Sequence, residues 1–229
     1  MKIDRRELLC AAPAILLAGR ASGETPAPPL FPTGLLASNP VARRFTASPG
    51  LVAPDTTLLG ADGPHKLGEL GGKIHIVTLW AEWCAPCLIE MPDLAALNDR
   101  HGGAKFGVLA VLTDSRKKLG VAQADTLLRA RGAALPLWVE PNGGGDVNKA
   151  LAQGRAPAGG LPCNLLVDAR GRIRGRSFGV VLADKVDLPK DRPLSDADKQ
   201  KLLLSNLRTS WSSAAADAFV NALVGGALR

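Results

Sequence analysis

The feature that most constrains this chain is a cysteine pair, Cys84 and Cys87, placed between a strand-like and a helix-like segment. Residues 74–80 are a nearly unbroken β-favouring run, which predicts a strand buried on both faces of a sheet. Pro86 suits the first turn of a helix, where its missing N–H costs nothing, and apolar residues at helical spacing follow to about residue 101. The cysteines are therefore expected where a central strand passes into a helix.

Thiol chemistry is the strongest of three explanations for this pair. Cys84 would precede the helix, so its sulfur would lie near the N–H groups of the first turn, whose partial positive charge favours the thiolate. The thiolate is the nucleophile in disulfide exchange. Cys87, one turn later, would face the helix interior and attack the mixed disulfide that Cys84 makes. We therefore expect Cys84 to be the attacking thiol and Cys87 the resolving thiol.

The other two explanations are a zinc site and a structural disulfide. A zinc site needs a second pair of ligands, but only Cys163 and three isolated histidines remain. A structural disulfide closing so small a loop would stabilise the fold by only about 2 kcal/mol. A copper-handling module that uses Cys84, Cys87 and Cys163 stays open as an alternative, because thiolates are soft ligands that suit Cu(I). No other metal site is predicted.

The amino terminus has the order of an export signal. Paired arginines, Arg5 and Arg6, precede an apolar stretch at 8–18, and small residues follow to Gly23. The stretch is too short to span a bilayer, which takes about 20 residues, but it suits a signal-peptide core. The arginine pair resembles a twin-arginine signal. We predict a signal peptide at 1–23 and a periplasmic location, with membrane anchoring if it is not cleaved. An uncleaved amphipathic start on a cytosolic protein is the alternative.

Composition argues against nucleic-acid binding. The formal net charge is +7, but lysine and arginine are scattered, and aromatic residues make up only 4% of the chain, with no tyrosine. Stacking platforms and concentrated basic patches are therefore not expected. Removal of the predicted signal would leave three cysteines, and an odd count in an exported protein indicates a reactive thiol rather than a disulfide framework.

The rest of the chain predicts one α/β domain. Residues 24–50 are rich in Pro, Ala, Gly and Ser and are expected to be a flexible lead-in. Residues 56–67 predict a short hairpin around a turn. Strands then alternate with helices and a hairpin at 165–178 closes the order, which favours a mixed sheet. Further strands are expected at 106–112 and 137–140, and further helices at 115–131, 146–153 and 214–223.

One continuous run resembles the thioredoxin-like TlpA/ResA family: Leu79-Trp80-Ala81-Glu82-Trp83-Cys84-Ala85-Pro86-Cys87, followed by Glu90, Met91 and Pro92. The resemblance covers most of residues 52–180 and resumes near Trp211. It implies a thioredoxin-like domain over 51–229, with a central mixed β-sheet flanked by helices, an N-terminal hairpin extension and an insertion at about 181–208. It also implies an extracytoplasmic thiol–disulfide oxidoreductase, a class that includes reductases serving cytochrome c maturation.

The resemblance implies further site residues. Gly160-Leu161-Pro162 looks like the family's segment with a cis-proline beside the active site, so Pro162 is expected to be cis and the Leu161 backbone to face the substrate. Trp83, Ala85 and Pro86 are expected at the substrate surface.

Glu90 is a candidate proton carrier. It follows Cys87 by three residues and would share its helix face. A partly buried carboxylate there could exchange protons with Cys87 during resolution. A solvated helix residue is the alternative interpretation.

Cys163 directly follows the expected cis-proline. A third thiol would then lie close to the pair and could take part in exchange, although a small buried strand residue is the plainer interpretation. The chain has no nucleotide or flavin fingerprint, so no cofactor is expected beyond the redox-active Cys84–Cys87 disulfide. The expected partners are a protein with a disulfide or thiol and a membrane-embedded thiol donor, and no nucleic acid. We expect a periplasmic reductase that reduces disulfides of a protein substrate by dithiol exchange through Cys84 and Cys87. Because Ala85-Pro86 alone does not set the reduction potential, a thiol oxidase of the same fold is the alternative.

Overall fold

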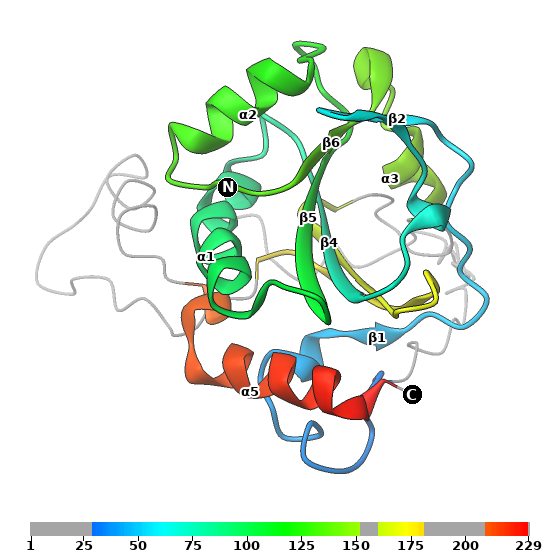
Figure 1. Ribbon diagram of the computed structural model, residues 1–229, viewed down its shortest axis with the longest axis vertical. Coiled ribbons are helices and arrows are strands. Elements are labelled where there is room, and N and C mark those ends of the chain that lie inside the picture. The colour runs from blue at the N-terminus through cyan, green and yellow to red at the C-terminus, as the bar shows by residue number, and fades with distance from the viewer. Residues whose placement is uncertain (1–28, 152–159, 181–208, 229) are drawn as a thin grey trace, which may run out of the picture.

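The computed structural model describes residues 29–151, 160–180 and 209–228, and these form one mixed sheet with helices on both faces (Figure 1). The strand order is β1-β8-β7-β4-β5-β6-β2-β3. The strands are β1 Thr46–Ala47, β2 Leu58–Gly60, β3 Gly63–His65, β4 Ile74–Trp80, β5 Phe106–Leu112, β6 Leu137–Val139, β7 Cys163–Val167 and β8 Ile173–Phe178. The helices are α1 Ala85–His101, α2 Val121–Arg129, α3 Asp146–Leu151 and α5 Ala214–Ala222, and two 3₁₀ turns used below are η1 Ala42–Arg44 and η4 Ser210–Ser212.

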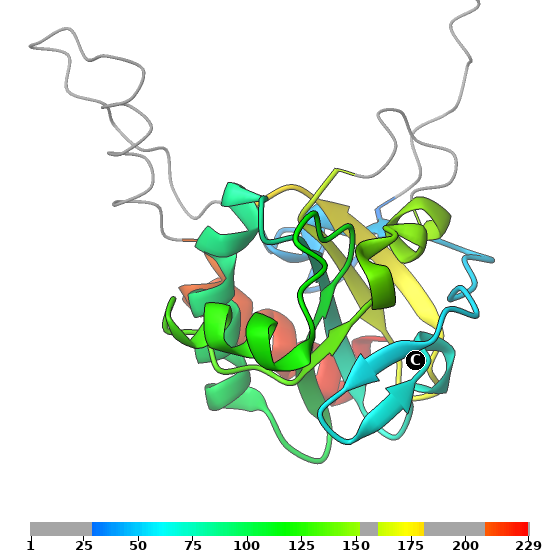
Figure 2. The ribbon, with the colours of Figure 1, turned by 90° about the horizontal axis from the view of Figure 1, so that it is seen from above.

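The central strand β4 pairs in parallel with β5 and antiparallel with β7. Its side chains are buried on both faces, because helices cover the sheet from either side. Side chains of α1, α2 and α5 fill one core, and side chains of α3 lie in a second core across the sheet (Figure 2). The molecule is thus built in three layers, with β4 leading directly into the cysteine pair.

The predicted thioredoxin-like fold is confirmed. The strands expected at 74–80 and 106–112 are β4 and β5 with the predicted bounds, and the expected N-terminal hairpin is β2 and β3, which pair antiparallel. The predicted signal peptide at 1–23 and the predicted insertion at about 181–208 lie outside the described residues. Within the part of the chain that is described, no helix is both long and apolar enough to cross a membrane.

The prediction of a flexible lead-in at 24–50 is wrong over its described part, residues 29–50. β1 pairs with β8, and Phe45 is fully buried against Trp211 and Phe219. Only a few residues of the segment are buried, and they lie in short turns. The sequence therefore shows no helical or strand periodicity that would have predicted their burial.

The helix expected at 115–131 begins only at Val121. Asp114 and Lys118 have φ angles of 52° and 51°, in the left-handed region that interrupts a right-handed helix. Ser115 instead supports a loop, since its Oγ accepts the Leu119 N–H at 3.1 Å. This loop lies beside the cysteine pair, as described below.

Candidate active site

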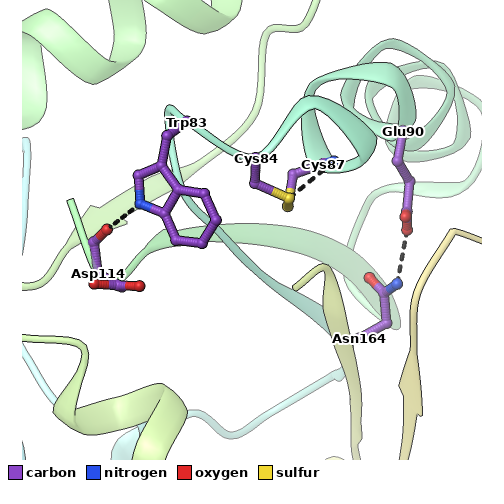
Figure 3. The surroundings of a disulfide bond; sticks show 6 residues. All are labelled: Trp83, Cys84, Cys87, Glu90, Asp114 and Asn164. Atoms are coloured by element: carbon purple, nitrogen blue, oxygen red, sulfur yellow. Dashed lines mark hydrogen bonds between the residues drawn. A yellow bond between two sulfur atoms is a disulfide. The ribbon is translucent and has the colours of Figure 1, made fainter. Parts of the chain in front are cut away.

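Cys84 and Cys87 form a disulfide at the start of α1 (Figure 3). Cys84 is the N-cap residue, and its Sγ accepts the backbone N–H of Cys87 at 3.2 Å. Pro86 occupies the first turn, where no N–H is needed. Cys84 is 4% exposed and Cys87 is fully buried. Cys84 is therefore the sulfur nearer the surface and the one that accepts a helix N–H, an arrangement that favours its thiolate.

Glu90 is fully buried on α1, one turn beyond Cys87. Its Oε1 accepts two hydrogen bonds, from Asn164 Nδ2 at 2.7 Å and from Trp211 Nε1 at 2.6 Å. Burial raises the pKa of Glu90 to about 7, although the Trp211 and Asn164 hydrogen bonds and the charge of Arg44 favour the carboxylate. The interpretation of Glu90 as a solvated residue is wrong. An acid that titrates near neutral pH is suited to accept and return a proton.

Asn164 and Trp211 were not expected at the site. Asn164 lies on β7 and points toward Glu90, beside the disulfide (Figure 3). A polar residue within an apolar strand indicates a buried hydrogen-bond partner, so the sequence held a signal for Asn164. Trp211 lies in η4, 121 residues from Glu90 along the chain, and no local pattern links the two.

The peptide bond between Leu161 and Pro162 is cis, as the resemblance implied. It immediately precedes β7, whose first residue, Cys163, pairs with Leu79 near the end of β4. Cys84 follows the carboxyl end of β4 closely, and Pro162 precedes the start of β7. Because these two strands are antiparallel, Pro162 and Cys84 lie at the same end of the pair. Contact of Leu161 and Pro162 with a substrate stays a prediction.

Trp83 borders the disulfide and is 39% exposed, whereas Trp80 is fully buried in the core. The Trp83 indole donates its Nε1–H to the Asp114 carbonyl at 2.7 Å, and the Arg116 guanidinium lies 4.3 Å from the ring centroid. The loop after β5 thus holds Trp83 in place at the surface. Ala85 and Pro86 are also exposed. Substrate binding by these residues stays a prediction.

Cys163 faces away from the pair. Its side chain is 1% exposed and packs in the second core with Val77 and Leu165, whereas Cys84 and Cys87 belong to the first core. Burial raises the pKa of the Cys163 thiol to about 12, so it is held protonated. Cys163 thus lies on the opposite face of the sheet from the pair, and its part in exchange stays a prediction. Its plainer interpretation, a small buried strand residue, is confirmed.

A metal site is not assembled among the described residues. They contain no group of three or more His, Cys, Asp or Glu side chains placed to hold an ion. The three sulfurs that a copper module would use lie in different cores.

Comparisons with known proteins agree with this chemistry. The profile of the AhpC/TSA family matches residues 49–176. The thiol:disulfide interchange protein HelX of Rhodobacter capsulatus is 32% identical over 145 residues, which cover 62% of this chain and 74% of HelX. The thiol-disulfide oxidoreductase ResA of Geobacillus thermodenitrificans is 27% identical over 139 residues, or 60% of this chain and 73% of ResA.

Among solved structures, a putative thiol:disulfide interchange protein DsbE from Chlorobium tepidum covers 70% of this chain and 98% of its own, with 23% identity and a TM-score of 0.46. The family profile covers more than half of this sequence. The alignment with HelX has more than 30% identity and covers 74% of HelX. The chain belongs to the AhpC/TSA family and is a thioredoxin-like thiol–disulfide oxidoreductase.

Proposed function

We propose that this oxidoreductase works in the periplasm and reduces disulfides of a protein substrate through Cys84 and Cys87. The observation that carries the proposal is the asymmetry of the pair: Cys84 caps α1 near the surface, whereas Cys87 is fully buried one turn before the buried acid Glu90. Such an arrangement separates the attacking sulfur from the sulfur that completes the exchange.

The reaction begins with the reduced pair. The Cys84 thiolate attacks one sulfur of the substrate disulfide, and a Cys84–substrate mixed disulfide forms as the other substrate sulfur leaves as a thiolate and takes up a proton. The Cys87 thiol then gives its proton to the Glu90 carboxylate and attacks Cys84 Sγ. The Cys84–Cys87 disulfide forms, and the second substrate sulfur leaves. Two electrons have passed from the pair to the substrate.

Separate observations support the location and the client. The twin-arginine-like amino terminus supports export to the periplasm, and the names of HelX and ResA support protein thiols as substrates. The resemblance to the TlpA/ResA family supports a role in cytochrome c maturation. The electrons would then come from a membrane-embedded thiol donor.

Trapping of the mixed disulfide tests the proposal. A Cys87→Ser variant, expressed in the native envelope, should accumulate covalent adducts through Cys84, because the resolving thiol is missing. Mass spectrometry of the adducts would name the client. A Cys84→Ser variant is the matched control and should trap nothing. If Cys87→Ser also traps no protein, the proposed activity is wrong.

The direction of electron flow is tested by redox equilibration against a glutathione buffer. Thioredoxin-like pairs span about −270 mV to about −120 mV. A reductase should lie toward the more reducing end of this range. A value near the oxidising end would replace the reductase with a thiol oxidase of the same fold.

A further inference from the structure

We infer that Trp211 is a positioning residue of the redox site: together with Asn164 it fixes the orientation of the Glu90 carboxyl and leaves Oε2 as the oxygen that carries the proton. The inference deepens the proposed function, since it rests on Glu90 as the proton acceptor of Cys87. It adds the carboxy-terminal segment to the machinery of the reaction.

The hydrogen-bond pattern distinguishes the two oxygens of Glu90. Oε1 accepts from Trp211 and from Asn164, whereas Oε2 is buried and has no hydrogen-bond partner among the described residues. An indole N–H can only donate. Oε1 must therefore remain an acceptor in both protonation states, and the proton is left to Oε2.

The Trp211 indole is held in this position from three sides. The backbone N–H and the hydroxyl of Thr209 donate to Asp93 Oδ2 at 2.8 and 2.7 Å, which fixes the start of η4 on α1. Arg100 donates to the Trp211 carbonyl at 3.1 Å. The Trp211 ring is fully buried and meets Phe45 edge to face, with centroids 6.4 Å apart. The backbone of η4 is therefore fixed on α1, and the indole cannot turn away from Glu90 without the loss of its packing against Phe45.

Two charged groups act on Glu90, one from another element and one from its own helix. Arg44 in η1 favours the carboxylate, and Asp93 on α1 opposes it. Loss of the Trp211 N–H would leave both charges in place and remove a hydrogen bond that stabilises the carboxylate. Glu90 would then stay protonated at neutral pH and could not accept the proton of Cys87, so resolution of the mixed disulfide would slow.

The test compares two Trp→Phe variants of the full chain. Trp211→Phe removes an indole N–H that bonds Glu90, whereas Trp80→Phe removes one that is equally buried and has no partner among the described residues. The Glu90 carboxyl is titrated by ¹³C NMR in the disulfide form, with Glu90→Gln to assign the signal. A hydrogen bond to a charged group is worth enough to move the midpoint upward by about one pH unit in Trp211→Phe. Trp80→Phe should leave it unchanged.

A second readout follows the reaction itself. A nitrothiobenzoate group is attached to Cys84, and its release by Cys87 is measured across the pH range. The rate profile of Trp211→Phe should move upward by the same amount as the NMR midpoint, and that of Trp80→Phe should not move. A merely structural effect of Trp211 would change the rate at every pH without moving the profile.

The outcomes test the role of Trp211 and the proposed function separately. Equal NMR midpoints in Trp211→Phe and wild type, or equal shifts in both Trp→Phe variants, would overturn the inference. If Trp211→Phe does not fold, Asn164→Ala removes the second donor from β7, and an unmoved midpoint there would overturn it as well. If the wild-type protein carries out no disulfide exchange, the proposed function fails while the NMR titration still decides the role of Trp211.

Discussion

At the scale of single residues, one acid beside the cysteine pair lies where charge is costly. Glu90 is fully buried, and burial raises its pKa from the usual 4.5 to about 7. Between these two values the folded protein binds more protons than the unfolded chain, so stability falls as pH rises. The fold therefore carries a cost that a structural role alone would not require, which is typical of groups that move protons.

The first prediction concerns this cost. In Glu90→Gln the charge can no longer form, so the variant should gain stability relative to wild type as pH rises from 4.5 through 7. The gain should approach about 3 kcal/mol and then level off. Urea unfolding of the disulfide form at a series of pH values measures it. Glu69→Gln, at an exposed position, is the control and should show no such trend. A pH-independent difference between Glu90→Gln and wild type would show that the fold does not raise the pKa of Glu90.

At the scale of elements, α1 is the centre of the site, and both neighbours that fix it are distant in sequence. η4 docks on α1 through Asp93, Arg100 and the Trp211 indole, and β7 reaches it through Asn164. The start of α1 places Cys84 and Cys87 at the end of β4, and the hydrogen bonds from Trp211 and Asn164 set the surroundings of Glu90. The redox helix is thus held along its length, not only at its cap.

The second prediction tests the docking of η4. Asp93→Ala removes the acceptor of both Thr209 hydrogen bonds and should lower the free energy of unfolding by about 2 kcal/mol, since bonds to a charged acceptor are the stronger kind. The urea midpoint measures the change. Asp99→Ala is the matched control, because Asp99 is an exposed acid on the same helix. Equal effects of the two substitutions would contradict the docking role of Asp93.

At the scale of the whole molecule, three distant parts of the chain share the first core. Phe45 before the hairpin, Trp211 in η4 and Phe219 in α5 are each fully buried and meet ring to ring. The amino-terminal and carboxy-terminal segments lie side by side below the sheet in Figure 1. The described part of the predicted lead-in is therefore part of the core, and it packs against Trp211, which donates a hydrogen bond to Glu90.

The third prediction follows from this shared core. Phe45→Ala should lower the free energy of unfolding by about 3–5 kcal/mol, as is usual for the loss of a buried aromatic ring. Leu35→Ala is the control: Leu35 lies in the same segment but is 83% exposed, so its loss should cost little. Chemical denaturation of both variants measures the difference. If Phe45→Ala matches Leu35→Ala, the segment is not part of the folded core.

The sequence predicted most where the signal was local. The apolar runs at 74–80 and 106–112 form the buried strands β4 and β5, and Pro86 lies in the first turn of α1, two residues after the N-cap Cys84. Glu90 was found by its spacing from Cys87, since three residues along a helix keep one face.

The rest depended on partners that no local pattern reveals. Phe45 and Trp211 meet only in three dimensions, so a segment without periodicity appeared to be a lead-in. Cys163 was expected near the pair because it follows Pro162, but alternation along β7 turns its side chain to the opposite face and gives the site Asn164 instead. Neighbouring residues of a strand therefore place their side chains on opposite faces of the sheet.

The most direct test of the central claim is exchange between the reduced protein and a disulfide-bonded peptide in excess, followed by intact-mass spectrometry after an acid quench. The peptide should become a dithiol as the Cys84–Cys87 disulfide forms, one for one, and Cys87→Ser should stop at a mixed disulfide on Cys84. Cys84→Ser should leave the peptide unchanged. Reduction of the peptide by Cys84→Ser at the wild-type rate, or a mixed disulfide that maps to Cys163, would show that Cys84 is not the attacking thiol.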